Sequence, residues 1–228
     1  MSSRPALSVV VPALDAAVAL PATLASIVAA RRDIELDLTV VDGGSTDDTV
    51  VIARHFGARV VVAPRGRGAQ LSAGAAATHG DWLLFVHADT VLGAEWPSAA
   101  RAFAATGSGR AGWLRFALDD PSPAARRLER LVAWRCRVLA LPYGDQGLLL
   151  ARSLYDAVGG YRPLPLMEDI DLVRRLGRHR IAPVAASAIT SAERWRRQGY
   201  LRRSARNLAC LALWHMGVPA RAIARLYG

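Results

Sequence analysis

Short runs of aliphatic and β-branched residues alternate with segments of helical composition through the first part of the chain. The apolar runs predict strands over residues 7–11, 36–41, 58–62 and 81–86. The segments between them predict helices over residues 16–32, 47–56 and 69–79. Strands that alternate with helices at this spacing form βαβ units with parallel strands and right-handed crossovers. The pattern therefore predicts an α/β fold, with a Rossmann-like, mostly parallel sheet flanked by helices.

The rest of the chain is less regular but continues the alternation. It predicts helices over residues 95–106, 124–140, 153–158, 168–176 and 200–216. It predicts further strands over residues 112–118, 147–151 and 181–189. Because no repeat or low-complexity linker interrupts these elements, we expect one α/β domain over residues 1–192. Residues 193–228 are expected to form a basic helical extension packed on that domain.

Charge is distributed unevenly along the chain. The formal net charge is +10, and all 29 basic residues are arginine. Residues 1–161 hold 16 Arg against 15 acids, whereas residues 162–228 hold 13 Arg against 4 acids. An excess confined to the C-terminal third favours a local anionic partner over a uniformly basic surface.

Two further features of the sequence indicate the cellular compartment in which the protein acts. Cys136 and Cys210 are far apart and lack metal-ligand spacing, which indicates free thiols in a reducing environment. Pro12 and Asp15 interrupt the first apolar run, so it does not resemble a signal peptide, and no run is long enough to cross a membrane. We therefore expect a cytoplasmic protein.

The predicted strand over 81–86 runs directly into polar residues. Four apolar residues, Leu83 to Val86, suit a strand buried on both faces, and His87 and Asp89 follow at once. Open α/β sheets bind ligands at the carboxyl ends of their strands. His87 and Asp89 are therefore candidates for a ligand site. The alternative interpretation is an ordinary strand end at which Asp89 forms a turn.

A second candidate follows the strand over 36–41. Asp42 and Gly43 open a glycine turn, and a carboxylate there can accept from a nucleoside base or a ribose hydroxyl. Ser45 and Asp48 fit a helix capping box, which leaves Asp42 unexplained. The segment Pro12-Ala13-Leu14-Asp15 ends the neighbouring strand, and we expect it to form the other wall of the same ligand pocket.

Two later segments combine charge with flexible backbone. The loop Arg65 to Gln70 is rich in arginine and glycine and opens a helix, which suits a diphosphate, although such loops are also common solvated turns. Glu168, Asp169 and Asp171 begin another helix, where acids complement the helix dipole or act as a general base. Asp145 and Gln146 add polar groups between two glycines, and we place them on the acceptor side of the site.

These motifs, in this order, resemble family 2 glycosyltransferases of the GT-A fold. The resemblance rests on Ser8 to Pro12, Val41 to Asp47, His87 to Asp89 and Glu168 to Leu172. The segments Gly66 to Leu71 and Gly144 to Gly147 also resemble a subgroup of short bacterial "transferase 2" proteins, linked to radical-SAM, selenium or arsenosugar gene neighbourhoods.

The resemblance implies roles for individual residues. A nucleoside diphosphate sugar, with uridine favoured, would be the donor, and an unidentified hydroxyl the acceptor. Asp169 matches the catalytic base of an inverting transfer, supported by Glu168 and Asp171. The donor-binding residues implied are Pro12, Ala13, Leu14, Asp15, Asp42, Gly43, Arg67, Gly68, Gln70, His87 and Asp89.

The Asp-x-Asp element of the family is altered here, because His87 replaces its first acid. Asp89 would be the metal-binding residue, and the resemblance implies Mg²⁺ or Mn²⁺. Imidazole suits Mn²⁺ better than it suits Mg²⁺. Without a metal, Arg67 and protonated His87 would offset the charge of the leaving diphosphate.

The C-terminal third admits two interpretations. Residues 194–218 interleave arginines with aromatic and aliphatic residues, as in a helix lying on an anionic membrane at its inner face. The other interpretation is a helix packed on the domain. Arg194 and Trp195 resemble part of a Gln-x-x-Arg-Trp element of larger relatives, but the Gln is missing, so no role is assigned.

Two rival functions remain. A sugar-phosphate nucleotidyltransferase would need a basic, glycine-rich loop directly after the first strand, where Pro12 to Asp15 stand. An arginine-rich module that binds membranes or nucleic acid without catalysis has no use for acids at several strand ends. We therefore expect a glycosyltransferase that does not bind nucleic acid.

Overall fold

A computed structural model describes residues 7–227 of the chain, so residues 1–6 of the predicted first domain and Gly228 lie outside it. The strands are β1 (Leu7–Ala13), β2 (Leu36–Asp42), β3 (Arg59–Val62), β4 (Trp82–Phe85), β5 (Thr90–Leu92), β6 (Ala111–Leu118), β7 (Leu148–Ala151) and β8 (Ile181–Thr190). The helices are α1 (Leu20–Val28), α2 (Thr49–His55), α3 (Arg67–Ala76), α4 (Trp96–Ala105), α5 (Pro123–Leu139), α6 (Arg152–Ala157), α7 (Glu168–Leu176), α8 (Glu193–Gln198), α9 (Tyr200–His215) and α10 (Ala220–Tyr227).

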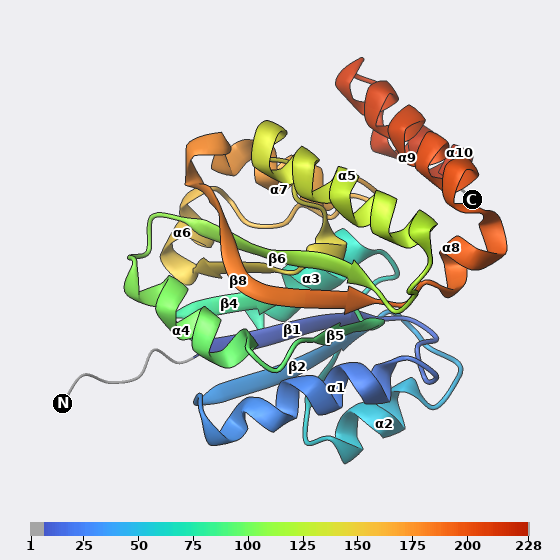
Figure 1. The fold of residues 1–228 in the computed structure, drawn as a ribbon. Coiled ribbons are helices and arrows are strands. Elements are labelled where there is room, and N and C mark those ends of the chain that lie inside the picture. The colour runs from blue at the N-terminus through green and yellow to red at the C-terminus, as the bar shows by residue number, and fades with distance from the viewer. Residues whose placement is uncertain (1–6, 228) are drawn as a thin grey trace.

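Within residues 7–227 the strands form one eight-stranded sheet in the order β3-β2-β1-β4-β7-β6-β8-β5. The first four strands pair in parallel, as the alternating pattern predicts. Strand β7 is antiparallel to both β4 and β6, whereas β6 and β8 are parallel. Figure 1 shows α1 and α2 below the sheet and α5 and α7 above it. The predicted α/β fold, with a mostly parallel sheet flanked by helices, is confirmed.

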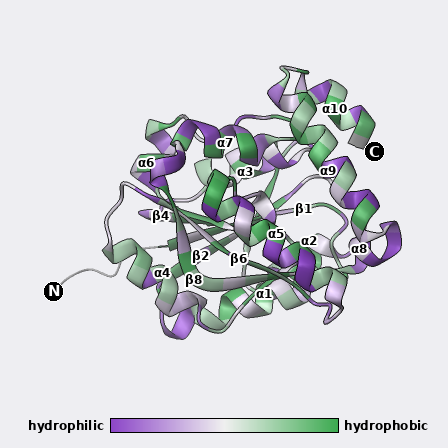
Figure 2. Cartoon of the chain, turned by 45° about the horizontal axis from the view of Figure 1, so that its top comes forward, coloured by the Kyte–Doolittle hydropathy of each residue, from purple (hydrophilic) through white to green (hydrophobic). Residues whose placement is uncertain are grey.

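The core lies on both faces of the central strands. Val9, Val10 and Val11 of β1 are fully buried, and Leu83 of β4 is equally inaccessible. Both faces of these strands are covered, so their sequences are continuously apolar. The surface helices carry apolar and polar residues on opposite sides, which Figure 2 shows as green and purple stripes. The apolar side of each helix is thus available to cover the sheet.

The structure corrects several predicted boundaries. Helix α1 begins at Leu20 rather than residue 16, and the backbone N–H groups of residues 15–17 donate to side chains of the loop after β2 and of Thr49 at the start of α2. Among these bonds, the Asp15 N–H donates to Ser45 Oγ at 2.9 Å. Helix α2 begins at Thr49, so the predicted capping box of Ser45 and Asp48 is wrong. Ser45 instead ties two loops together.

The C-terminal segment forms three helices where the sequence predicted one. Helix α9 contacts α5, α8 and α10, and Figure 1 shows α9 and α10 beside one end of α5. A cluster of buried apolar residues joins the segment before α7 to α9 and α10: Leu166, Met167, Ile170, Cys210 and Ile223. The division at residue 192 stays a prediction. In the part of the chain that the structure describes, no helix is long and apolar enough to span a membrane.

Candidate active site

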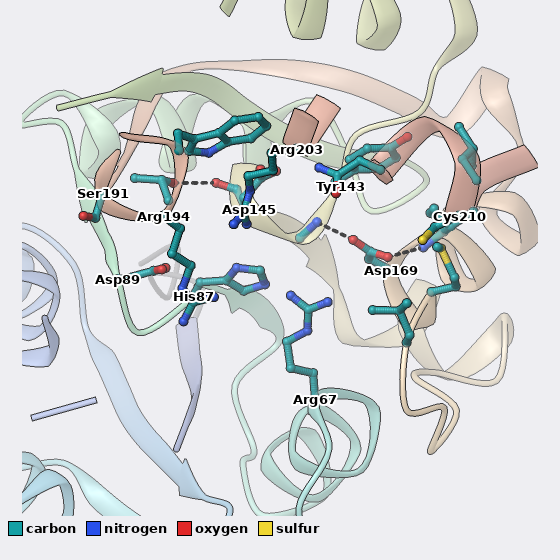
Figure 3. Close-up of a pocket in the computed structure, with 18 of the residues that line it drawn as sticks. Arg67, His87, Asp89, Tyr143, Asp145, Asp169, Ser191, Arg194, Arg203 and Cys210 are labelled. Atoms are coloured by element: carbon teal, nitrogen blue, oxygen red, sulfur yellow. Dashed lines mark hydrogen bonds between the residues drawn. The ribbon is translucent and has the colours of Figure 1, made fainter. Parts of the chain in front are cut away.

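Two adjoining cavities open at the carboxyl ends of β1 and β4. One has a volume of about 450 Å³ and is lined by the β1 loop and the start of α3. The other, of about 360 Å³, is lined by the segments before α7, the loop at Tyr143–Asp145 and helix α9. Both cavities are lined by Arg67, His87, Asp89, Ser191 and Arg194. Figure 3 shows these five residues in the second cavity, together with Asp145 and Asp169.

The first cavity contains the predicted wall at the end of β1. Pro12, Ala13, Leu14 and Asp15 all line it. Asp15 adopts a positive φ of 45°, and its carboxylate accepts from the Thr46 backbone N–H at 2.8 Å. The loops after β1 and β2 are therefore held together before any ligand binds.

Other residues predicted to bind the donor lie behind this wall. Asp42 is 4% exposed, and its carboxylate accepts from the backbone N–H groups of Gly44 and Ser45. Gly43 packs against the side chain of Gln70, since a Cβ at Gly43 would lie 3.0 Å from Gln70 Nε2. Asp42 and Gly43 do not line either cavity, and they shape the turn instead.

Gln70 and Gly68 also have structural roles that the sequence did not reveal. Gln70 lines the first cavity, but its amide group donates to the carbonyls of Ala13 at 2.7 Å and Val41 at 2.8 Å. It thereby joins the ends of β1 and β2. Gly68 is buried against the backbone of residues 162–164 and lines neither cavity. Its smallness permits α3 to pack closely.

Arg67 stands between the two cavities. Its side chain is 42% exposed, and its Nε lies 2.8 Å from Glu168 Oε1, which is almost fully buried. Burial raises the pKa of Glu168 to about 7, against the opposing effect of Arg67. Glu168 therefore pairs with Arg67, and the charge of Asp169 also acts on it, so its predicted support of Asp169 stays a prediction.

His87 lies next to Arg67 at the boundary of the cavities (Figure 3). Burial and the positive charge of Arg67 together lower the pKa of His87 to about 4, against the effect of Asp89. The imidazole is therefore neutral near pH 7. The prediction that a protonated His87 offsets the diphosphate charge concerns the complex with the donor, and it stays a prediction.

Asp169 is the carboxylate that faces the second cavity from the first turn of α7. Its Oδ2 accepts from the Gly144 backbone N–H at 2.7 Å, which orients the side chain. Asp145 lines the same cavity, and its Oδ1 is buried without a hydrogen-bond partner. The glycine loop and the helix start thus place two carboxylates on one cavity, as Figure 3 shows.

Two predicted residues lie outside the cavity. Gln146 is fully buried, and its side-chain oxygen accepts from the Tyr143 N–H and from Arg135, so its acceptor-side placement is wrong. Asp171 pairs with Arg162 at 3.3 Å and Arg175 at 2.6 Å on the other side of α7. Its predicted support of Asp169 is also wrong, because residues 169 and 171 of a helix do not face the same way.

Three residues of the site were missed from the sequence. Arg194 and Ser191 line both cavities, and Trp195 lines the second. The Arg194-Trp195 pair was the available signal, and it was set aside because the Gln of the longer element is missing. Ser191 occupies that position of the element and still faces the site.

A metal ion would find few protein ligands here. Within residues 7–227 no group of three or more His, Cys, Asp and Glu side chains is arranged to hold one. Asp89 offers one carboxylate at the boundary of the cavities. This set fits an ion that takes most of its ligands from a bound phosphate group and water, as Mg²⁺ often does.

A family model described as "Glycosyl transferase family 2" matches residues 8–158 of the chain. The matched region includes the β1 loop, Arg67, His87, Asp89 and Asp145. The chain belongs to glycosyl transferase family 2.

Named relatives and solved structures agree with that membership. A "PGL/p-HBAD biosynthesis glycosyltransferase" of Mycobacterium tuberculosis is 38% identical over 98 residues, which cover 40% of this chain and 38% of the relative. The chain thus matches well under half of that relative's length. Glucosyl-3-phosphoglycerate synthase from Mycobacterium tuberculosis, solved with Mn²⁺ and UDP-glucose, has a TM-score of 0.65 and 26% identity. That likeness covers 96% of this chain and 81% of the other.

The fold is shared more widely. TarS from S. aureus, solved with UDP-GlcNAc, has a TM-score of 0.64 at 18% identity. The likeness covers 81% of this chain and 58% of TarS, and it concerns the fold alone.

Replacing Asp145 with Asn is expected to flatten the pH dependence of stability. Burial raises the pKa of Asp145 to about 6, so the folded protein holds this proton more tightly than the unfolded chain. Stability is therefore lost as the pH rises through the window from about 4 to about 6. At pH 7 the free energy of unfolding of the variant should exceed that of the wild type by on the order of 2 kcal/mol, and at pH 3.5 the two should be equal. Urea unfolding at both pH values measures these free energies. The same difference between variant and wild type at both pH values would refute the prediction.

Proposed function

We propose that the protein transfers a sugar from a nucleoside diphosphate donor to an acceptor hydroxyl, with inversion at the anomeric carbon. The observation that carries this proposal is the joining of two cavities at the sheet edge. The Pro12–Asp15 wall lines one cavity, and Asp169 faces the other. Such an arrangement lets a donor and an acceptor approach one another from two sides.

The chemistry follows from the placement of the charged groups. Asp169 would take the proton from the acceptor hydroxyl, whose oxygen then attacks the anomeric carbon. The bond between that carbon and the diphosphate breaks, and the nucleoside diphosphate leaves with the bonding electrons. Arg67 and Arg194 line the boundary where this negative charge would develop, and they would stabilise it.

A bound Mg²⁺ or Mn²⁺ would supply additional positive charge to the diphosphate. Asp89 is the residue that would hold it, and His87 beside it would offer an imidazole nitrogen to Mn²⁺. The structure of glucosyl-3-phosphoglycerate synthase solved with UDP-glucose supports a UDP-sugar as donor. Asp42 and Gly43 would then shape the nucleoside pocket from behind the Pro12–Asp15 wall.

Finer assignments belong to the same proposal. The loops at Gly66 to Leu71 and Gly144 to Gly147 support membership of the short "transferase 2" subgroup linked to radical-SAM, selenium or arsenosugar genes. The protein would act in the cytoplasm. Peripheral contact with an anionic membrane through residues 194–218 is supported by Leu201 and Leu208, which are 88% and 63% exposed among the arginines of α9.

Donor binding should raise the melting temperature, because a ligand that binds only the folded state stabilises it. At a donor concentration of one hundred times the dissociation constant, the gain is about 2.7 kcal/mol. A thermal-shift screen of UDP-, GDP- and TDP-sugars, each with and without Mn²⁺, measures it. An Arg67→Gln variant should lose most of the shift, whereas Arg110→Gln, at an exposed site away from the cavities, should retain it. No shift with any nucleotide would contradict the proposal.

A further inference from the structure

The second cavity has a part that belongs to the acceptor side. Apart from the five residues that also line the first cavity, its wall comes from the segment 165–170, the Tyr143–Asp145 loop and helices α8 and α9. Most of this wall lies beyond residue 158, where the family match ends. Most of the acceptor-side wall therefore comes from segments outside the region that the family model matches.

Apolar side chains form one continuous part of this wall. The aliphatic and sulfur-containing members come from the segment before α7, from α7 itself and from α9: Leu166, Met167, Ile170, Cys210 and Leu211. They belong to the buried cluster that joins α7 to α9 and α10, or pack against it. The wall is therefore the exposed side of a hydrophobic cluster that is continuous with the protein interior.

The positive charge in this part of the cavity is engaged within the protein. The Arg203 guanidinium lies 4.8 Å from the centre of the Trp195 ring and donates to Gln198 Oε1. Arg67 and Arg194 also line this cavity, but at its boundary with the first cavity, where the donor diphosphate would engage them. Beyond that boundary the wall holds Asp145 and Asp169 beside Arg203, so an acceptor with a phosphate or carboxylate would meet no excess of positive charge there.

The remaining polar groups suit neutral hydroxyls. Asp145 Oδ1 and Asn207 Oδ1 are buried, and neither has a hydrogen-bond partner. Both residues line the cavity. A buried oxygen without a partner costs free energy, so a ligand O–H group that reaches it contributes to binding.

We infer that the acceptor is a neutral alcohol on an apolar skeleton, held between the 165–170 segment and α9 with its hydroxyl at Asp169. This inference rests on the proposed function and names its substrate class. A cavity of about 360 Å³ is at the small end of ligand sites, which fits one aromatic ring or a short stretch of chain beside the donor sugar. The alcohol comes either from solution or from a lipid, and the experiment separates these sources.

The test compares acceptors at fixed UDP-glucose or UDP-GlcNAc with Mn²⁺, with product detected by mass spectrometry. The neutral apolar probes are 4-methylphenol in solution and farnesol in detergent micelles, and the anionic ones are glycerate and 3-phosphoglycerate. We expect transfer to a neutral probe with kcat/KM at least tenfold higher than to either anion. The better of the two neutral probes identifies a soluble or a lipid source. Preference for an anion would overturn the inference.

Two leucines provide a matched pair of variants. Leu211 of α9 lines the cavity, whereas Leu131 of α5 is 64% exposed and does not. Leu211→Gln should raise the KM for the neutral probe about tenfold, which is the usual discrimination of an apolar pocket, and Leu131→Gln should leave it unchanged. UDP affinity and melting temperature report whether each variant is folded. Equal effects in the two variants would overturn the inference.

Binding of 4-methylphenol, measured by calorimetry in the presence of UDP and Mg²⁺, separates this inference from the proposed function. If 4-methylphenol binds and Leu211→Gln weakens that binding, the inference is supported even when no sugar is transferred, and only the proposed function fails. If sugar is transferred to glycerate and neither 4-methylphenol nor farnesol binds, the inference is overturned and the proposed function stands.

Discussion

Replacing Asp169 with Asn is expected to lower kcat by about a thousandfold while donor affinity stays within about twofold of the wild type. A positioned general base contributes about a hundredfold to ten-thousandfold. The amide keeps the shape of the carboxylate and can still contact the Gly144 loop, but it cannot take a proton from the acceptor. Asp169 lines the second cavity and not the first, so the wall at Pro12–Asp15 is undisturbed.

The measurement combines steady-state transfer kinetics with calorimetric binding of UDP to the same preparation. Asp156→Asn serves as the matched control, since Asp156 is an exposed acid of α6 that lines neither cavity. Retention of more than a tenth of the wild-type kcat in Asp169→Asn would remove this residue as the base. The nearest alternative carboxylate on the same wall is Asp145.

Replacing Gly68 with Ala is expected to destabilise the fold by about 1–3 kcal/mol or more, the usual cost of overpacking. A Cβ at this position would lie 2.3 Å from the Arg162 carbonyl oxygen and 2.7 Å from the Leu164 backbone N. Backbone atoms cannot rotate away as a flexible side chain can, so α3 and the 162–164 segment must separate. Arg67 is the neighbouring residue of α3, and its pairing with Glu168 should weaken as well.

Urea unfolding of Gly68→Ala, together with its affinity for UDP, checks this expectation. Gly109→Ala is the control, because no atom lies within 4 Å of a Cβ built there and its φ is not in the left-handed region. That variant should be as stable as the wild type or slightly more stable. A Gly68→Ala protein with unchanged stability would contradict the packing described for α3.

Sequence reasoning succeeded where a motif coincides with the end of a regular strand. Apolar runs define β1 and β4, and the polar residues directly after them, Asp15 and Asp89, line the cavity as predicted. Asp169 was found because it matches a family motif, although spacing alone could not distinguish it from Asp171. The structure separates the two by contacts, since only Asp171 pairs with Arg162 and Arg175.

The failures share a physical cause, which is contact between segments far apart in the sequence. Gln146 looked like a ligand-binding amide, but it donates to the Leu114 carbonyl of β6 and accepts from Arg135 of α5. Gln70 lines the first cavity, but its bonds to β1 and β2 could not be read from its neighbours in the sequence. Strand β5 is three residues long and pairs with β8, so no local pattern marks it. Arg194 lies in the site because strand β8 brings the chain back to the cavities. The residues next to Arg194 in the sequence do not reveal this.

The backbone of Met167 links the C-terminal helices to the position of Asp169. Met167 precedes α7 with φ of 66°, a left-handed conformation that costs a non-glycine residue roughly 1–2 kcal/mol. Burial of its side chain in the cluster with Cys210 and Ile223 offsets this cost. The same residue sets the direction in which α7 starts, and hence the direction of the Asp169 side chain. A related chain with different C-terminal helices would therefore have to keep residue 167 buried in the same way, or the carboxylate proposed as the base would be displaced.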